Sequence, residues 1–136
     1  MELLEVSGLS KNFGGLRAVQ DLDFRVRAGE ILGLVGPNGA GKTTVFNLIN
    51  GVYLPNGGQI LFQGEDLVGL KPHKIASKGI ARTFQLATLY NNCSALESVV
   101  IGHHLKMQTG LGSILLRTPL FWSEEKKAKE NSLQLL

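Results

Sequence analysis

A glycine-rich loop between an apolar run and a helical pattern constrains the fold of this chain more than any other feature. Residues 31–35, Ile-Leu-Gly-Leu-Val, form a continuous apolar run of the kind found in strands that are buried on both faces. The glycine-rich residues 36–41 follow, and apolar residues then recur at helical spacing over residues 42–50. A strand, a loop and a helix in this order predict an α/β fold.

The loop also has the residue types and the spacing of a phosphate-binding site. Residues 36–43 match the pattern Gly-x-x-x-x-Gly-Lys-[Ser/Thr]. Gly39 and Gly41 can take backbone angles closed to other residues, which lets successive amide N–H groups converge on one anion. Lys42 supplies a mobile positive charge, and the Thr43 hydroxyl can ligate a Mg²⁺ ion that bridges phosphate oxygens. A chance glycine turn is the alternative interpretation, and the strand before the loop and the helix after it favour the phosphate site.

Composition excludes several other classes of protein. The 136 residues are enough for one compact domain, and 14 Lys and Arg stand against 11 Asp and Glu. This small, scattered excess does not indicate a nucleic-acid partner. The single cysteine, Cys93, allows no disulfide within the chain. Acidic residues at the N-terminus are unlike a signal peptide, and no run approaches the about 18 apolar residues of a membrane span. We therefore expect a cytoplasmic protein that meets a membrane only through a partner.

The rest of the pattern predicts strands first and helices later. Strands are expected over residues 3–9, 18–26, 59–63 and 80–85, with an irregularity near Asp21. Helices are expected over residues 72–79 and from residue 94 or 95 to about 106. A last, charged helix is expected to have Ser123 as its N-cap and to carry Glu125 and Lys129 four residues apart.

Three segments together resemble the ATPases of the ABC transporter family. Residues 29–44 are similar to the Walker A region of these ATPases almost letter for letter, and residues 79–85, which end in Arg-Thr-Phe-Gln, resemble the segment that ends in the Q-loop glutamine. With residues 13–19, they resemble the LivG-like branched-chain amino acid importer subfamily. The resemblance covers essentially the whole chain. It implies the N-terminal part of an ABC-type P-loop NTPase over residues 1–136, with an antiparallel β subdomain and phosphate-loop core over 1–90 and the start of the helical subdomain over 91–136.

The resemblance also implies roles for individual residues. ATP is the expected ligand, with Mg²⁺, and catalytic roles fall on Lys42 and Gln85. Phe13 lies where an aromatic ring stacks on adenine, with a place in the core as its alternative. Gln85 and Thr43 are expected to contact Mg²⁺. The loop residues expected to hold the nucleotide are Asn38, Gly39, Ala40, Gly41, Lys42, Thr43 and Thr44.

The family's signature motif, Walker B aspartate, catalytic glutamate and switch histidine have no counterpart in residues 1–136. We therefore expect this truncated chain to bind nucleotide with negligible turnover, because hydrolysis needs a positioned water and full charge stabilisation.

The expected partners are a second ATP-binding subunit and transmembrane permease subunits, which would hold the chain at the inner membrane. The isolated chain is expected to form a homo-oligomer through residues 31–35. The alternatives are a non-catalytic remnant, which acts only in nucleotide binding or assembly, and another P-loop enzyme such as a small kinase. The antiparallel strands before the loop and the Arg-Thr-Phe-Gln segment after it disfavour the kinase.

Overall fold

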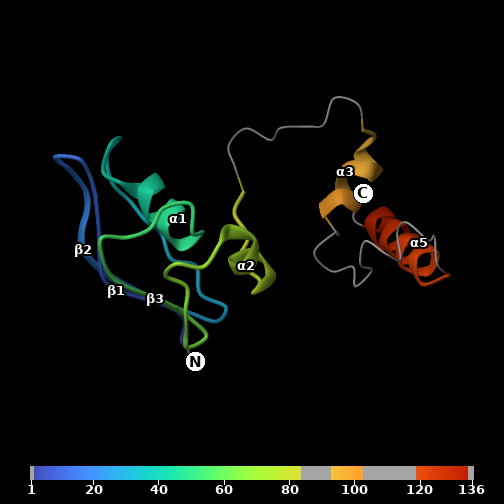
Figure 1. The fold of residues 1–136 in the computed structure, drawn as a ribbon, viewed down its shortest axis with the longest axis horizontal. Helices are drawn as coiled ribbons and strands as arrows, with labels where there is room; N and C mark the ends of the chain where they lie inside the picture. The colour runs from blue at the N-terminus through green and yellow to red at the C-terminus, as the bar shows by residue number, and fades with distance from the viewer. Residues whose placement is uncertain (1, 84–92, 103–118, 135–136) are drawn as a thin grey trace. The chain divides into compact units, whose positions relative to one another are not determined.

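The computed structural model describes residues 2–83, 93–102 and 119–134 of the chain. The chain divides into two compact units, residues 1–83 and residues 84–136 (Figure 1). The elements in chain order are β1 (Glu2–Phe13), β2 (Leu16–Arg27), α1 (Lys42–Ile49), β3 (Gly57–Phe62), β4 (Glu65–Asp66), α2 (Pro72–Ser77), α3 (Ala95–Gly102) and α5 (Pro119–Leu133). In the described part of the chain, no helix combines the length and the apolar character needed to cross a membrane.

The first unit is built on an antiparallel sheet with the strand order β2-β1-β3-β4. β1 is an inner strand, and Val6 on it pairs with Phe24 of β2 on one side and with Ile60 of β3 on the other. The strands predicted over residues 3–9, 18–26 and 59–63 are confirmed as β1, β2 and β3, although β1 and β2 extend further than expected and meet at a tight turn. The predicted irregularity is also confirmed, because Asp21 has a φ of 47° and the register of the β1–β2 pair shifts nearby.

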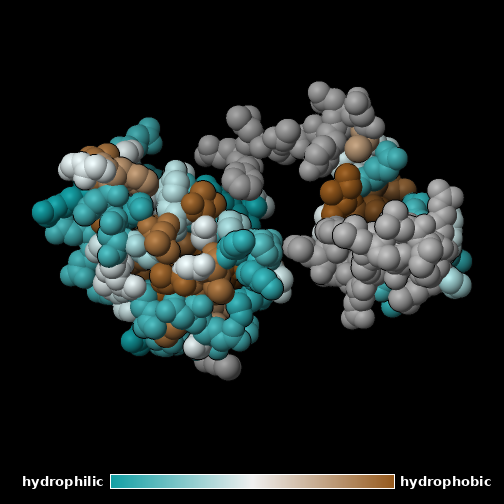
Figure 2. Space-filling model, in the orientation of Figure 1, coloured by the Kyte–Doolittle hydropathy of each residue, from teal (hydrophilic) through white to brown (hydrophobic). Residues whose placement is uncertain are grey.

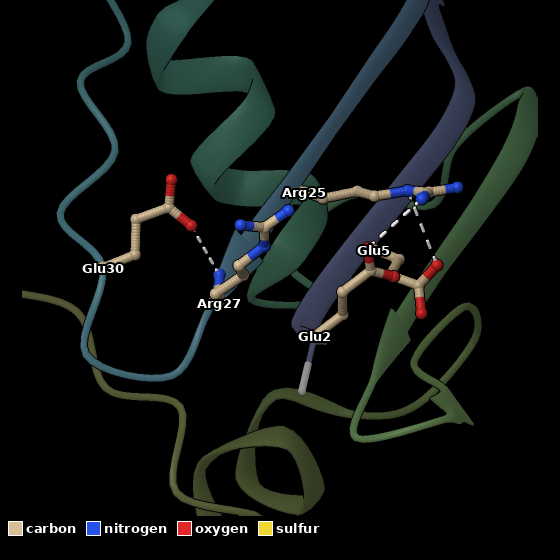
Figure 3. Close-up of polar contacts among 5 residues, drawn as sticks. All are labelled: Glu2, Glu5, Arg25, Arg27 and Glu30. Carbon is tan, nitrogen blue, oxygen red and sulfur yellow. Dashed lines mark hydrogen bonds and ion pairs between the residues drawn. The ribbon is translucent and has the colours of Figure 1, made fainter.

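Charged side chains tie the outer ends of β1 and β2 together on the surface (Figure 3). The Arg25 guanidinium lies 3.2 Å from the Glu2 carboxylate and 3.7 Å from the Glu5 carboxylate. Beyond the end of β2, the Arg27 N–H donates to the Glu30 carboxylate at 2.7 Å, and the Glu30 N–H donates back to the Arg27 carbonyl at 3.1 Å. Exposed pairs of this kind contribute at most about 1 kcal/mol. The two bonds between Arg27 and Glu30 close the turn that leads the chain into residues 31–35.

Helix α1 packs on the sheet through one apolar face. Its residues Val45, Leu48 and Ile49 are buried, as their spacing predicts. They share one core with residues from β1, β2, β3, α2 and the segment between β4 and α2: Val6, Leu9, Val19, Ile60, Leu67 and Ile75. The helix ends where expected, before Gly51, which has a φ of 70°. The predicted helix over residues 42–50 is therefore confirmed, and its position on the sheet is fixed by the core.

The prediction of a buried strand over residues 31–35 is wrong. These residues form no strand, and Ile31 and Val35 are 98% and 94% exposed. An interior strand needs hydrogen-bonding neighbours on its edges, and among the described residues no strand pairs with this run. Large apolar side chains of the first unit therefore face solvent, and Figure 2 shows apolar residues among the hydrophilic ones on the face in view. Residues 80–83 likewise form no strand, and residues 84–85 lie outside the described residues.

The second unit contains the contacting helices α3 and α5. The predicted start of α3 is confirmed, and residues 103–106 of that prediction lie outside the described residues. The predicted pair is confirmed, with Lys129 Nζ 2.8 Å from the Glu125 carboxylate. Ser123 is not the N-cap of α5, since the helix begins four residues earlier at Pro119. Proline suits the first helical position, because its missing N–H would have no helical acceptor there.

Candidate functional site

The loop before α1 is a tight turn that depends on two glycines. The Ala40 N–H donates to the Pro37 carbonyl at 3.2 Å, which closes the turn. Gly39 and Gly41 have φ values of 85° and 80°, in the left-handed region that the sequence predicts for them. The chain therefore folds over itself and enters α1 directly from the turn.

Gly41 also fixes the loop to the sheet. A Cβ atom added at Gly41 would lie 2.2 Å from the Ala18 carbonyl oxygen on β2, whereas a Cβ atom at Gly39 would meet nothing within 4 Å. The backbone at Gly41 thus comes closer to β2 than any other residue type allows. This contact and the buried face of α1 together set where the loop lies.

The N-terminus of α1 is open to an anion. Its first backbone hydrogen bond runs from the Val45 N–H to the Gly41 carbonyl at 3.0 Å, so the preceding N–H groups of the first turn have no helical acceptor. No side chain caps this end, and no acidic residue lies in the first turn. At α3, by contrast, the Glu97 carboxylate accepts the Ser94 N–H at 2.7 Å and the Ser94 hydroxyl accepts the Glu97 N–H at 3.2 Å. Unpaired N–H groups and the positive end of the helix dipole make α1 the better site for phosphate.

The Lys42 ammonium lies at the same loop. Its Nζ donates to the Gly36 carbonyl at 2.6 Å and to the Pro37 carbonyl at 2.7 Å. These acceptors are neutral, and a phosphate oxygen would form a stronger, charge-assisted bond to the same ammonium. A phosphate group at the loop would therefore meet a positive charge that is already in place.

A pocket of about 280 Å³ borders the loop. It lies between β2 and the residues on either side of the phosphate loop, and Lys42 contributes the charged group to a lining that is otherwise mostly apolar. The lining residues are Ala18, Val19, Gln20, Leu22, Leu34, Val35, Ala40, Lys42 and Val45. The pocket gives space for a small ligand beside the Lys42 residue.

The structure brings most of the predicted site residues together, because Asn38 through Thr44 are contiguous along the loop and the start of α1. Phe13 lies at the end of β1 and is not among the residues that line the pocket. Phe13 is 41% exposed, so it is not part of the buried core. The Phe13 and Tyr53 rings pack edge to face with their centres 5.1 Å apart, and the Lys11 ammonium lies 5.2 Å from the centre of the Phe13 ring. Gln85 lies outside the described residues.

Sequence reasoning missed one contact beside the loop helix. Arg82 Nη1 donates to the Asn47 side-chain oxygen at 2.5 Å, and the guanidinium lies 5.7 Å from the centre of the Phe46 ring. Arg82 and Asn47 are 35 residues apart, so no local pattern could have paired them.

The residues present fit a Mg²⁺ ion that arrives with phosphates. Mg²⁺ keeps several waters and is usually held by one or two protein ligands together with phosphate oxygens. Thr43 is exposed in the first turn of α1, where its hydroxyl is available as one such ligand. The described residues contain no group of three or more His, Cys, Asp or Glu side chains that could hold a metal without phosphate.

Comparisons with known proteins identify the family of this chain. The family model described as ABC transporter matches residues 19–135. The chain is 44% identical over 128 residues to the high-affinity branched-chain amino acid transport ATP-binding protein BraF of Pseudomonas aeruginosa, which covers 94% of this chain and 50% of BraF. It is 43% identical over 130 residues to the corresponding protein LivG of Escherichia coli, which covers 96% of this chain and 51% of LivG. The chain thus spans about half the length of these curated relatives.

Solved structures show the same fold. A nucleotide-free ATP-binding cassette from an ABC transporter matches with a TM-score of 0.70 and 29% identity over 88% of this chain and 47% of the other. The ADP conformation of an ATP-binding cassette matches with a TM-score of 0.71 and 30% identity over 85% of this chain and 46% of the other. The predicted family and fold class are therefore confirmed, and this chain belongs to the ABC transporter family.

Proposed function

We propose that the chain is the N-terminal part of the ATP-binding subunit of an ABC importer for branched-chain amino acids. The observation that carries the proposal is the open N-terminus of α1, which follows the glycine loop and has the Lys42 ammonium beside it. The names of BraF and LivG supply the importer and its substrate class. In this proposal residues 1–90 form the nucleotide-binding core and residues 91–136 begin the helical subdomain.

The proposed ligand is ATP with Mg²⁺. The amides of residues 38–44 surround the phosphates, and Lys42 neutralises the charge that they carry. Thr43 and Gln85 bind Mg²⁺, and Phe13 stacks on the adenine through its exposed face. Mg²⁺ would screen the charge of the bridging phosphate oxygens.

The whole importer subunit would act with a second ATP-binding subunit and with permease subunits at the cytoplasmic side of the inner membrane. Residues 1–136 alone are proposed to bind nucleotide with negligible turnover. Their sequence holds no signature motif and no Walker B aspartate to complete the charge stabilisation of the transition state. The same result would fit the second candidate, a remnant that acts only in nucleotide binding or assembly.

Calorimetric titration with Mg-ATP tests the proposal. Lys42→Ala removes a charge-assisted interaction, so the affinity should fall at least about tenfold. Lys74→Ala is the matched control, because Lys74 is exposed on α2 and away from the loop sequence. Equal affinity of wild type and Lys42→Ala would contradict the phosphate site. Phosphate release, measured on the same samples, should stay at the background level.

A further inference from the structure

An aromatic pair joins the end of β1 to the segment that follows α1. The rings of Phe13 and Tyr53 pack edge to face, with an angle of 76° between their planes. Both residues lie at the surface, with 41% and 37% of their area exposed. Aromatic pairs in this geometry attract one another beyond the gain from buried apolar area. The contact therefore gives the Phe13 ring a defined place at the surface of the first unit.

The β1–β2 turn gives the Phe13 ring little support of its own. The turn is made by the two glycines of residues 14–15, which carry no side chains, and a Cβ atom added at either would meet nothing within 4 Å. Leu16, which pairs with Phe13 across the strands, is 67% exposed. The support that places the ring comes instead from the side of Tyr53.

Tyr53 is itself fixed to α1 and to β1. Its backbone N–H donates to the Asn47 carbonyl of α1 at 3.2 Å. Its neighbour Leu54 offers a carbonyl that accepts from the Lys11 ammonium of β1 at 2.7 Å, and the same ammonium lies over the Phe13 ring. The helix that begins at the phosphate loop therefore ends in a segment that carries the support for Phe13.

Phe13 lies a short way along the sheet from the phosphate loop. The loop meets the sheet where Gly41 abuts the Ala18 carbonyl of β2. The next residue, Val19, pairs with Lys11 of β1, and Phe13 is two residues beyond Lys11. Two strand residues span about 7 Å. A nucleotide with its phosphates at the loop therefore has Phe13 within reach of its base.

We propose that Tyr53 is a positioning residue for the nucleobase, which it serves by holding the Phe13 ring. It touches neither base nor phosphate in this arrangement, and it links the place of the ring to the helix that carries the phosphate loop. The inference rests on the proposed binding of ATP and names a further residue of that site.

Calorimetric titration with Mg-ATP and with magnesium tripolyphosphate, which has phosphates but no base, separates the two ends of the site. Tyr53→Leu keeps apolar bulk but removes the ring, so the affinity for Mg-ATP should fall about fivefold while the affinity for tripolyphosphate stays unchanged. Tyr53→Phe keeps the ring and should bind both ligands as the wild type does. Val52→Ala is the matched control, because it shortens an exposed side chain on the same segment and should change neither affinity.

A double variant tests whether Tyr53 acts through Phe13. Phe13→Ala should by itself lower the affinity for Mg-ATP alone, and Tyr53→Leu should then add nothing, because both changes remove one interaction. The inference would be overturned by a further loss in the double variant, by an unchanged Mg-ATP affinity in Tyr53→Leu, or by equal losses for both ligands, which mark a merely structural role. Each of these results leaves the phosphate site standing. If the wild type bound neither ligand, the proposed function would fail first, and the role of Tyr53 would fail with it.

Discussion

Alanine at Gly41 should destabilise the protein more than alanine at Gly39, although both glycines have a φ in the left-handed region. Both φ values lie near 80°, where an L-residue costs about 1–2 kcal/mol. Only at Gly41 would the new Cβ atom collide, at 2.2 Å from the Ala18 carbonyl oxygen. A backbone oxygen cannot rotate away, so β2 or α1 must shift, at a further cost of about 1–3 kcal/mol. We expect Gly41→Ala to lose about 2–5 kcal/mol and Gly39→Ala about 1–2 kcal/mol.

Urea unfolding of the wild type and the two variants, followed by far-UV circular dichroism, measures this difference. Each substitution lowers the entropy of the unfolded chain by the same amount, so that effect cancels between the two variants. Gly39→Ala therefore serves as the control for the backbone cost alone. Equal losses of unfolding free energy would show that the close contact with Ala18 does not hold the loop, and the account of how the site is positioned would be wrong.

Two further predictions concern the α3 cap and residues 31–35. The Ser94 backbone N–H, and then its hydroxyl, hold the pKa of Glu97 below its ordinary value of 4.5. A lowered pKa means that the carboxylate stabilises α3 above that value and that the stabilisation is lost as the pH falls through the folded-state pKa. Circular dichroism in acid should thus show a loss of helix in the wild type that is absent from the titration of the Glu97→Gln variant. Superimposable titrations of the two proteins would contradict the cap. Because Ile31 and Val35 are exposed, light scattering should show a mass that rises with concentration and that Ile31→Glu with Val35→Glu suppresses, whereas a monomer at every concentration would exclude this association.

The sequence predicts well those features that depend on neighbours along the chain. The positive φ at Gly39 and Gly41 follows from their residue type, and the buried face of α1 follows from the spacing of its apolar residues. The open helix start could be anticipated in the same way, since no capping or acidic side chain precedes or enters the first turn. These local rules were enough to predict the backbone of the candidate phosphate loop and the helix that follows it.

Features that depend on distant partners could not be predicted from the same patterns. Residues 31–35 have the composition of a buried strand, but a strand forms only where other strands supply hydrogen bonds. The approach of Gly41 to Ala18 depends on how α1 docks on the sheet, and the contact of Arg82 with Asn47 spans 35 residues. These three features depend on how distant segments pack together, so they cannot be predicted from composition or local spacing.

The phosphate loop is held more firmly on its helix side than on its strand side. After the loop, Gly41 abuts β2 and Val45 is buried in the core, so this end is fixed by backbone contact and by packing. Before the loop, Val35 is exposed, the Gly36 carbonyl accepts from the Lys42 ammonium, and the Pro37 carbonyl accepts from the same ammonium and from the Ala40 N–H. An ammonium has three donors, and two of them are used here, which leaves one for a phosphate oxygen without any loss. Lys42 can therefore close the strand side of the loop and contact the ligand at once, so its removal should loosen the loop as well as weaken the binding of nucleotide.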